Sequence, residues 1–293
     1  METTPKHIPV MVSEVVSYLN IQPAGIYFDG TVGLGGHSES IVKYLSKNGK
    51  LIGVDIDEYM VNLCRQRLKP IPDNLILQQA SYDSIDQVLQ SHSVKTIDGI
   101  LLDLGLSSLH LDTIDRGFSF QRENTLDMRF STDIQYNAAE IINSSSAQQL
   151  KKIFWNFGEE RYAGPIARAI KKAGRIETVN DIKNVIETIT PQRFLNRTLA
   201  RIFQALRIAV NNELQRLKDF LKKCIQTLNV GGRLIIISYH SLEDRIVKHA
   251  FKDFHEQGNF KILTKRPISP SQEEIVVNRR SQSAKLRAGE RIS

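Results

Sequence analysis

The chain has 293 residues, of which 41% are hydrophobic and 24% charged, a composition that excludes intrinsic disorder and allows one sizeable core plus a second domain. The net charge of +7 suits a polyanionic partner, although many basic proteins bind no nucleic acid. No stretch reaches the ~20 apolar residues that a bilayer crossing needs, and the first thirty residues carry no secretory pattern, so we expect a cytoplasmic protein without membrane contact.

The first hundred residues alternate short apolar runs with amphipathic segments, which is the pattern of a parallel α/β sheet. Helices are expected at residues 37–47 and 59–68, and a glycine-rich turn at residues 30–36. The expected strands are residues 26–29, 51–55, 75–77 and 97–103. Asp29, Asp55 and Asp103 each end a strand, so all three should lie at the carboxyl edge of the sheet, where α/β proteins bind their ligands.

The next buried strand is expected only at residues 234–238, after a gap of about 130 residues, while a βαβ crossover needs only a dozen or more. The gap therefore predicts an inserted domain. Residues 104–135 show little periodicity and are expected to face the substrate or cover a cofactor. Near the end of the chain, residues 284–287 are expected to form an edge strand that closes the sheet. Helical spacing of apolar residues in the gap covers residues 138–157, 162–173, 179–188 and 194–228.

The two cysteines, Cys64 and Cys224, each lie in an apolar, helix-like context. Neither has a second cysteine at metal-ligand spacing. We therefore expect buried free thiols rather than a disulfide or a zinc site, and we expect no metal centre.

The glycine turn and the acids indicate a nucleoside cofactor, because Asp55 follows Gly36 by 19 residues, the separation at which an acid reaches ribose hydroxyls. A dinucleotide fingerprint would read G-x-G-x-x-G, but no later glycine follows Gly35-Gly36 in register. Asp29 would repel a pyrophosphate and attract the sulfonium and ammonium groups of S-adenosyl-L-methionine, which is therefore favoured. The alternative, that the glycines only form a tight strand-helix turn, stays open.

Seven sequence blocks follow one another along the chain: DGTVGLGGHS (29–38), GILLDLGLSS (99–108), RGFSF (116–120), LDMR (126–129), GEER (158–161), FQALRIAVNNEL (203–214) and SLEDRIVK (241–248). In these blocks the chain resembles the 16S rRNA cytosine-N4 methyltransferase family, and the resemblance covers essentially its whole length. It implies an α/β, class I S-adenosylmethionine-dependent methyltransferase fold, Rossmann-like and mostly parallel, with an inserted helical domain. It divides the chain into a methyltransferase domain, residues 1–108 and 214–293, and a mainly helical substrate-recognition domain, residues 109–213.

The same resemblance implies methylation of the N4 amine of a cytidine near the ribosomal P site, with 16S rRNA in the assembled small subunit as the favoured substrate. It leaves the oligomeric state open between monomer and homodimer. Tyr82 stands where relatives often have phenylalanine, which keeps an aromatic face for adenine, and His110 stands where glutamine is usual, which alters the reach of that contact. The implied cofactor contacts are Gly35, Gly36, His37, Asp55, Tyr82, Asp103 and His110.

Two residues are candidates for catalysis. Asp103 opens a segment, residues 104–108, that is placed where related amino-methyltransferases carry their amine-binding loop, but the usual Pro-Pro-aromatic sequence is missing, and Asp103 is expected to bind cofactor rather than act as a base. His240 follows the strand at residues 234–238 and could relay a proton. The alternative, compatible with this, is that His240 leads into a helix capped by Ser241, with Asp244 completing a capping box.

A basic helix face in the insertion is the expected RNA contact. Residues 151–175 are also rich in Lys and Arg, and although such runs are usually solvated helix faces, phosphate contact is favoured here. Trp155 and Phe157 have apolar neighbours and are expected in the core rather than stacked on bases. Within about 120° of one another on a helix lie Arg193, Arg197, Arg201 and Arg207.

Two other functions remain as alternatives. A nucleotide-dependent oxidoreductase would share the glycine turn, but the Gly-Gly-His sequence departs from its fingerprint. A non-catalytic RNA-binding or ribosome-assembly protein could use a methyltransferase fold without transferring a methyl group.

Overall fold

The computed structural model describes residues 8–107, 109–110 and 116–293. Its contacts divide the chain into two compact units, Met1–Gly105 with Leu214–Ser293, and Leu106–Glu213. Residue 108, the expected end of the first segment, lies outside the described residues. In the part of the chain that is described, no helix combines the length and apolar character needed to cross a membrane.

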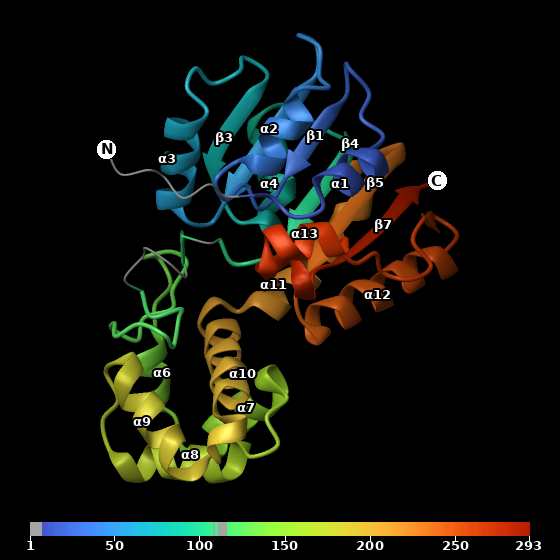
Figure 1. The fold of residues 1–293 in the computed structure, drawn as a ribbon. Coiled ribbons are helices and arrows are strands. Elements are labelled where there is room, and N and C mark those ends of the chain that lie inside the picture. Colours follow the sequence, from blue (N-terminus) through green and yellow to red (C-terminus); the bar gives the residue numbers. More distant parts are fainter. Residues whose placement is uncertain (1–7, 108, 111–115) are drawn as a thin grey trace. The chain divides into compact units, whose positions relative to one another are not determined.

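A single twisted sheet forms the centre of the first unit (Figure 1). In the described residues it has seven strands in the order β3-β2-β1-β4-β5-β7-β6. Neighbours from β3 through β5 are parallel, whereas β7 is antiparallel to both β5 and β6. The strands are β1 (Ile26–Asp29), β2 (Lys50–Asp55), β3 (Leu75–Gln79), β4 (Ile97–Asp103), β5 (Leu228–Ser238), β6 (Phe260–Ile262) and β7 (Lys285–Arg291).

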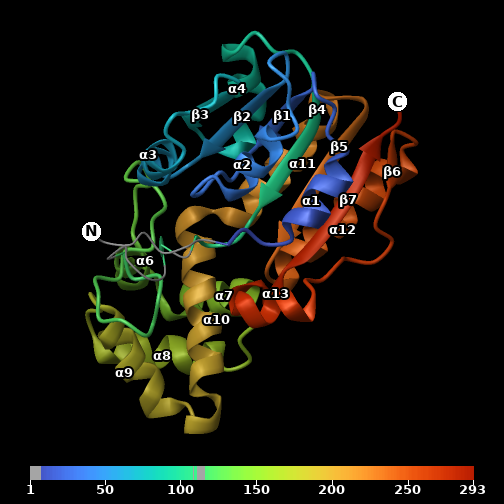
Figure 2. The same ribbon diagram turned by 45° about the horizontal axis from the view of Figure 1, so that its top comes forward.

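Helices cover both faces of this sheet, and Figure 2 shows them on either side of the strands. Successive strand residues point to opposite faces, so Phe28 of β1 packs in one apolar cluster and Tyr27 in the other. One cluster contains residues of α4, α11 and α12, and the other contains residues of α1 and α2. The helices of this unit are α1 (Val12–Leu19), α2 (Gly36–Val42), α3 (Glu58–Arg67), α4 (Ile85–Ser91), α11 (Glu213–Thr227), α12 (Ser241–Glu256) and α13 (Gln272–Val277), with 3-10 turns at Tyr82–Ser84 and Arg279–Ser283.

The prediction of a closing edge strand at residues 284–287 was wrong in its position. The strand exists as β7, but it lies between β5 and β6, so β6 forms that edge of the sheet. β6 has three residues and was too short to show a period-2 pattern in the sequence. The interior position explains the buried side chain of Arg287, whose Nε donates to Asp244 Oδ1 at 2.7 Å.

Five helices in the described part of the second unit pack around an apolar cluster of their own. Two helices that the sequence predicts as continuous are interrupted. Ser145 is extended and Ser146 caps a new helix, while Asn212 is left-handed at φ 50° and ends α10. In the described residues of this unit, the helices are α6 (Ala138–Ser144), α7 (Ala147–Gly158), α8 (Ala163–Ala173), α9 (Val179–Ile189) and α10 (Gln192–Asn211).

A buried amide, that of Asn211, joins the irregular segment before α6 to the end of α10. Its Oδ1 accepts the Phe130 N–H at 2.8 Å, and its Nδ2 donates to the carbonyls of Met128 at 2.8 Å and Arg207 at 2.9 Å. Because a buried amide is stabilising only when its donors and acceptor are engaged, this network fixes residues 128–130 against the helix.

Candidate active site

Three acids lie at the carboxyl ends of neighbouring parallel strands. The strand order reverses between β1 and β4, the position at which open α/β sheets bind their ligands. Asp29 ends β1, Asp103 ends β4, and Asp55 ends β2 beside β1. The fold therefore brings the predicted acids to the same edge of the sheet.

The turn between β1 and α2 depends on glycine at two positions. Gly33 and Gly35 have φ of +52° and +79°, and a Cβ on Gly35 would lie 2.5 Å from Cys64 Sγ. Asp55 holds the turn in place, because its Oδ2 accepts the Gly33 N–H at 2.9 Å and its Oδ1 accepts the Asp57 N–H at 3.0 Å. The carboxylate thus links the glycine turn to the start of α3.

Asp29 is a buried carboxylate beneath this turn, with 1% of its surface exposed. Its oxygens accept the Ser38 hydroxyl at 2.6 Å and the Thr31 N–H at 3.2 Å. Burial raises the pKa of Asp29, and this effect outweighs the hydrogen bond from Ser38 and the nearby His37, which lower the pKa. A cation bound at this edge would favour the ionised form.

Asp103 is held from two sides. Its backbone N–H donates to Thr31 Oγ1 at 2.6 Å, and its Oδ2 lies 3.5 Å from His37 Nε2. The hydroxyl of Tyr239, which follows β5, hydrogen-bonds to the Asp103 side chain. Burial, followed by the charge of Asp103, raises the pKa of Tyr239 well above its usual value, so Tyr239 remains a donor at neutral pH. Tyr239 was missed in the sequence, where only its position beside His240 marked it.

Several buried polar atoms at this edge have no hydrogen-bond partner among the described residues. They are both ring nitrogens of His37 and Oδ1 of Asp103. Buried polar atoms are normally satisfied, so these atoms indicate a polar ligand. Together with the acids of Asp29 and Asp103, they fit a ligand that carries positive charge and N–H donors, such as the sulfonium and ammonium groups of S-adenosyl-L-methionine.

Tyr82 and Gly36 complete the predicted set in this unit. Tyr82 opens the 3-10 turn after β3, and its ring meets the ring of Phe220 edge to face, with centroids 5.7 Å apart. Gly36 begins α2, where a Cβ would come within 2.9 Å of Pro9. The first unit therefore brings together six of the seven predicted cofactor residues.

His110, the seventh, belongs to the second unit. Its buried ring contacts the rings of Phe118 and Phe130, with centroid separations of 5.2 Å and 5.4 Å. Those two rings stack on each other at 5.3 Å. The contact of His110 with a cofactor stays a prediction.

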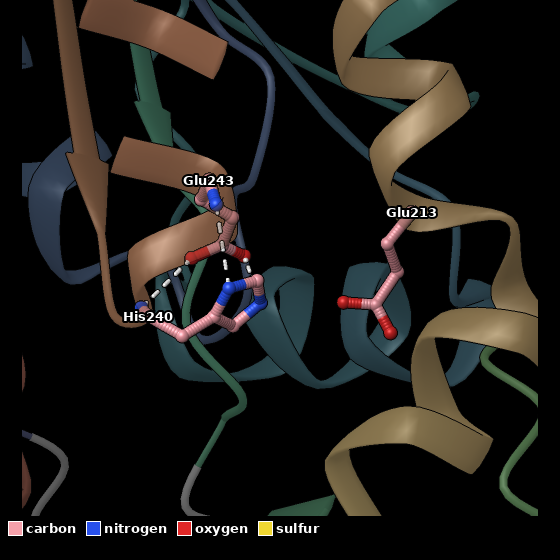
Figure 3. Close-up of side chains that lie close together, drawn as sticks. All are labelled: Glu213, His240 and Glu243. Carbon is pink, nitrogen blue, oxygen red and sulfur yellow. Dashed lines mark hydrogen bonds and ion pairs between the residues drawn. The ribbon is translucent and has the colours of Figure 1, made fainter. Parts of the chain in front are cut away.

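His240 caps α12 (Figure 3). Its Nδ1 accepts the Glu243 N–H at 3.3 Å, and its Nε2 lies 3.2 Å from Glu243 Oε1. Glu243 in turn accepts the His240 N–H, which completes a capping box. The prediction of Ser241 as the cap, with Asp244 in its box, was therefore wrong by one residue. Glu213, also drawn, belongs to the second unit, where it pairs with Arg207 at 2.9 Å.

The four arginines of α10 differ in their surroundings. Arg193 and Arg197 are exposed, and Arg193 lies over the ring of Phe194 at 4.7 Å. Arg201 lies 3.5 Å from the buried carboxylate of Glu160, and Arg207 pairs with Glu213. The last two arginines thus already have structural partners.

The expectation that Trp155 lies in the core was wrong, because 55% of its surface is exposed. Phe157, in contrast, packs against the core cluster as expected. Apolar neighbours in the sequence misled the prediction, because Trp155 lies on the outer face of α7, turned away from the side of Leu150 and Phe154.

Comparisons with known proteins cover nearly the whole chain. The family model described as "MraW methylase family" matches residues 4–292. A relative from Dictyoglomus thermophilum is 45% identical over 97% of this chain and 96% of its own length. One from Pseudothermotoga lettingae is 44% identical over 97% and 98%, and one from Fusobacterium nucleatum is 40% identical over 98% and 97%. All three are named "Ribosomal RNA small subunit methyltransferase H".

Proposed function

Because this chain belongs to the MraW methylase family, we propose that it methylates the N4 amine of a cytidine in the decoding, or P-site, region of 16S rRNA. The chain is an S-adenosyl-L-methionine-dependent rRNA methyltransferase with a class I, Rossmann-like fold. The cytidine in the P-site region, its N4 atom as the methyl acceptor and the assembled small subunit as the substrate are proposed. We propose that the chain acts on that subunit in the cytoplasm, and its net positive charge suits binding to RNA.

The observation that carries the proposal is the acidic edge of the sheet with its unsatisfied buried atoms. S-adenosyl-L-methionine supplies an electrophilic methyl group on a sulfonium when bound. Gly35, with a left-handed φ, lets the turn pack closely against Cys64, and Asp29 and Asp103 provide negative charge for a cation. The residues proposed to hold the donor are Gly35, Gly36, His37, Asp55, Tyr82, Asp103 and His110.

Asp103 is proposed to orient the reacting amine as well as the donor. A cytosine amine is a weak nucleophile because its lone pair is delocalised into the ring. An acceptor oxygen that holds an N–H of the amine favours a geometry in which this lone pair is free. Asp103 Oδ1 is a buried acceptor without a hydrogen bond among the described residues. Its alignment by Thr31 and Tyr239 would fix the direction of approach.

His240 is the weaker catalytic candidate. Nδ1 is an acceptor in the capping box, so the proton of the neutral ring lies on Nε2, which faces the Glu243 carboxylate. Nδ1 is thus committed to the start of α12, and Glu243, which the ring faces, accepts the Tyr239 N–H at 2.8 Å, whereas Nε2 has no hydrogen-bond partner among the described residues. We propose that its contribution to catalysis is the placement of Tyr239.

The target cytidine must leave its stack to reach such a site. Exposed cations on α10 are proposed to hold the flanking phosphates. Arg193 and Arg197 are available for this role. Arg201 and Arg207 would have to bind phosphate while each is already paired with a glutamate.

The test is methylation of small ribosomal subunits from cells that lack this activity. The purified chain is incubated with isotope-labelled donor and with either subunits or naked 16S rRNA, and the digested RNA is mapped by mass spectrometry. We expect labelled N4-methylcytidine in the P-site region, with more label in assembled subunits. The Asp103→Ala variant serves as the inactive control.

Two outcomes would overturn the proposal in different ways. Label on another base or another cytosine atom would contradict the N4 assignment. Absence of label in any small-subunit RNA, with the subunit still bound, would favour the non-catalytic assembly protein. Binding of NADH in preference to S-adenosylhomocysteine would support the oxidoreductase instead.

A further inference from the structure

An exposed group of basic and aromatic side chains lies on α7, on α8 and on the loop that joins them. Within residues 147–173 the only acids are Glu159 and Glu160, and Glu160 is buried against Arg201. The surface is therefore strongly positive. We name it the α7–α8 surface, and its members are Lys151, Lys152, Trp155, Arg161, Tyr162 and Arg168.

The side chains of Lys151 and Arg168, two cations of this surface, both lie close to Gly164. A Cβ on Gly164 would lie 3.5 Å from Arg168 Nη1 and 3.8 Å from both Cδ and Cε of Lys151. Neither Lys151 nor Arg168 forms an ion pair with any acid in the described part of the chain. Like charges brought together in this way repel each other, so an anion between them would be stabilised.

Two exposed aromatic rings belong to the same surface. Trp155 follows Lys151 by four residues on α7 and so shares its face, and Tyr162 stands at the N-cap of α8. Their exposed fractions are 55% and 63%. The core beneath is complete without them, since Leu150 and Phe154 fill the inner face of α7. Large exposed aromatic groups among cations are the combination that single-stranded nucleic acids recognise.

We propose that the α7–α8 surface binds a single-stranded segment of the rRNA substrate, separate from the nucleotide that is methylated. Bases stack on Trp155 and Tyr162, and phosphates lie at Lys151 and Arg168. The strand is single because bases within a duplex hide the faces that the aromatic rings would contact. This inference rests on the proposed RNA substrate and adds a second point of attachment for it.

Trp155 is the single tryptophan of the chain, so its fluorescence reports this surface directly. The full-length protein is titrated with a single-stranded oligoribonucleotide and with a hairpin duplex of the same composition. We expect saturable quenching by the single strand, reversed by added salt, and little quenching by the duplex. Lys151→Gln combined with Arg168→Gln should weaken binding and flatten its salt dependence.

The variant Trp155→Ala is tested for single-strand binding by fluorescence anisotropy of a labelled RNA. We expect affinity to fall by about 5- to 100-fold, the range for loss of one stacked base. Trp155→Lys, which keeps the site polar and positive, should lose affinity as well, and Trp155→Phe should retain part of it. Tyr44→Ala removes an equally exposed ring in the first unit and should leave affinity unchanged.

The outcomes separate this inference from the proposed function. Unchanged single-strand affinity in both Trp155→Ala and Trp155→Lys would refute RNA binding by the α7–α8 surface, even if the wild-type chain methylates rRNA. Equal quenching by the duplex would also overturn it, because stacking would then not be the source of the signal. A wild-type chain that binds the strand through Trp155 but never methylates small-subunit RNA would leave the surface intact and refute the methylation proposal.

Discussion

The hydrogen bond from Tyr239 to Asp103 joins the residue after β5 to the end of β4. It orients a carboxylate that has a second, unsatisfied oxygen, and it keeps the Tyr239 ring against Gly105, where a Cβ would lie only 2.7 Å from the ring. The backbone that leaves β4 thus packs against the aromatic side chain of Tyr239, which follows β5.

Tyr239→Phe should retain the ring and remove only its hydroxyl. We expect kcat to fall by about 10- to 100-fold, which corresponds to one hydrogen bond to a charged group, with a smaller change in the KM for RNA. Steady-state kinetics with ribosomal subunits measures this split. An equal loss in Tyr44→Phe, which changes an exposed tyrosine, would contradict the assignment.

The raised pKa of Tyr239 also predicts how stability depends on pH. The buried phenol stays neutral in the folded chain, so its contribution is full below about pH 10 and is lost as pH rises and the unfolded chain ionises. Tyr239→Phe should therefore be less stable than wild type at pH 8, and the difference should narrow by pH 10.5. Urea unfolding at the two pH values tests this, and a constant difference would refute it.

Asp55→Ala should weaken binding of S-adenosylhomocysteine by at least about 10-fold. The side chain anchors the Gly33 and Asp57 N–H groups, and it is also the residue proposed to reach the ribose. Titration calorimetry measures the affinity, and RNA binding should be retained. Asp73→Ala changes an exposed acid before β3 and provides the control. Unchanged affinity in Asp55→Ala would remove this residue from the site.

The acids at the strand ends could be identified from the sequence because their positions depend only on neighbouring residues in the chain. Asp29, Asp55 and Asp103 each follow an apolar run, and a parallel sheet places such ends together. Tyr239 could not be identified in this way. Its contact with Asp103 depends on the pairing of β4 with β5, which are separated in the chain by the whole second unit.

At the scale of elements, the strands β1 and β4 have the predicted bounds, while two of the long helices do not. Apolar periodicity continues across Ser145 and Asn212, so pattern alone predicts unbroken helices. The breaks depend on a cap at Ser146 and a left-handed residue at Asn212, which are single-residue effects. Trp155 shows the same limit, since periodicity could not identify which face of α7 meets the core.

Close packing of α7 on α10 gives a prediction for Gly158. A Cβ at this position would lie 2.6 Å from the Arg201 carbonyl oxygen, so Gly158→Ala should destabilise the second unit by about 1–3 kcal/mol. Gly164→Ala is the matched control, because its nearest contact is 3.5 Å and no loss is expected. Urea unfolding followed by circular dichroism compares them. Equal stability of the two variants would show that the helices can separate at little cost.

At the scale of the whole molecule, the surplus of positive charge should appear in the salt dependence of RNA binding. Arg193→Gln combined with Arg197→Gln should reduce the slope of log K against log salt by about 2 without altering donor affinity. Lys222→Gln with Lys252→Gln removes the same charge from the first unit, where both lysines already pair with acids, and should leave the slope nearly unchanged. Equal effects would indicate a response to net charge alone.

The division of the chain also has a consequence for its synthesis. β5 pairs with β4, but the residues between them include the entire second unit, so at ~5–20 residues per second β4 waits on the order of ten seconds for its neighbour to be translated. The second unit is continuous in sequence and can fold meanwhile from contacts within itself. The nascent chain would therefore carry a finished helical body before the strand that Tyr239 follows has left the ribosome.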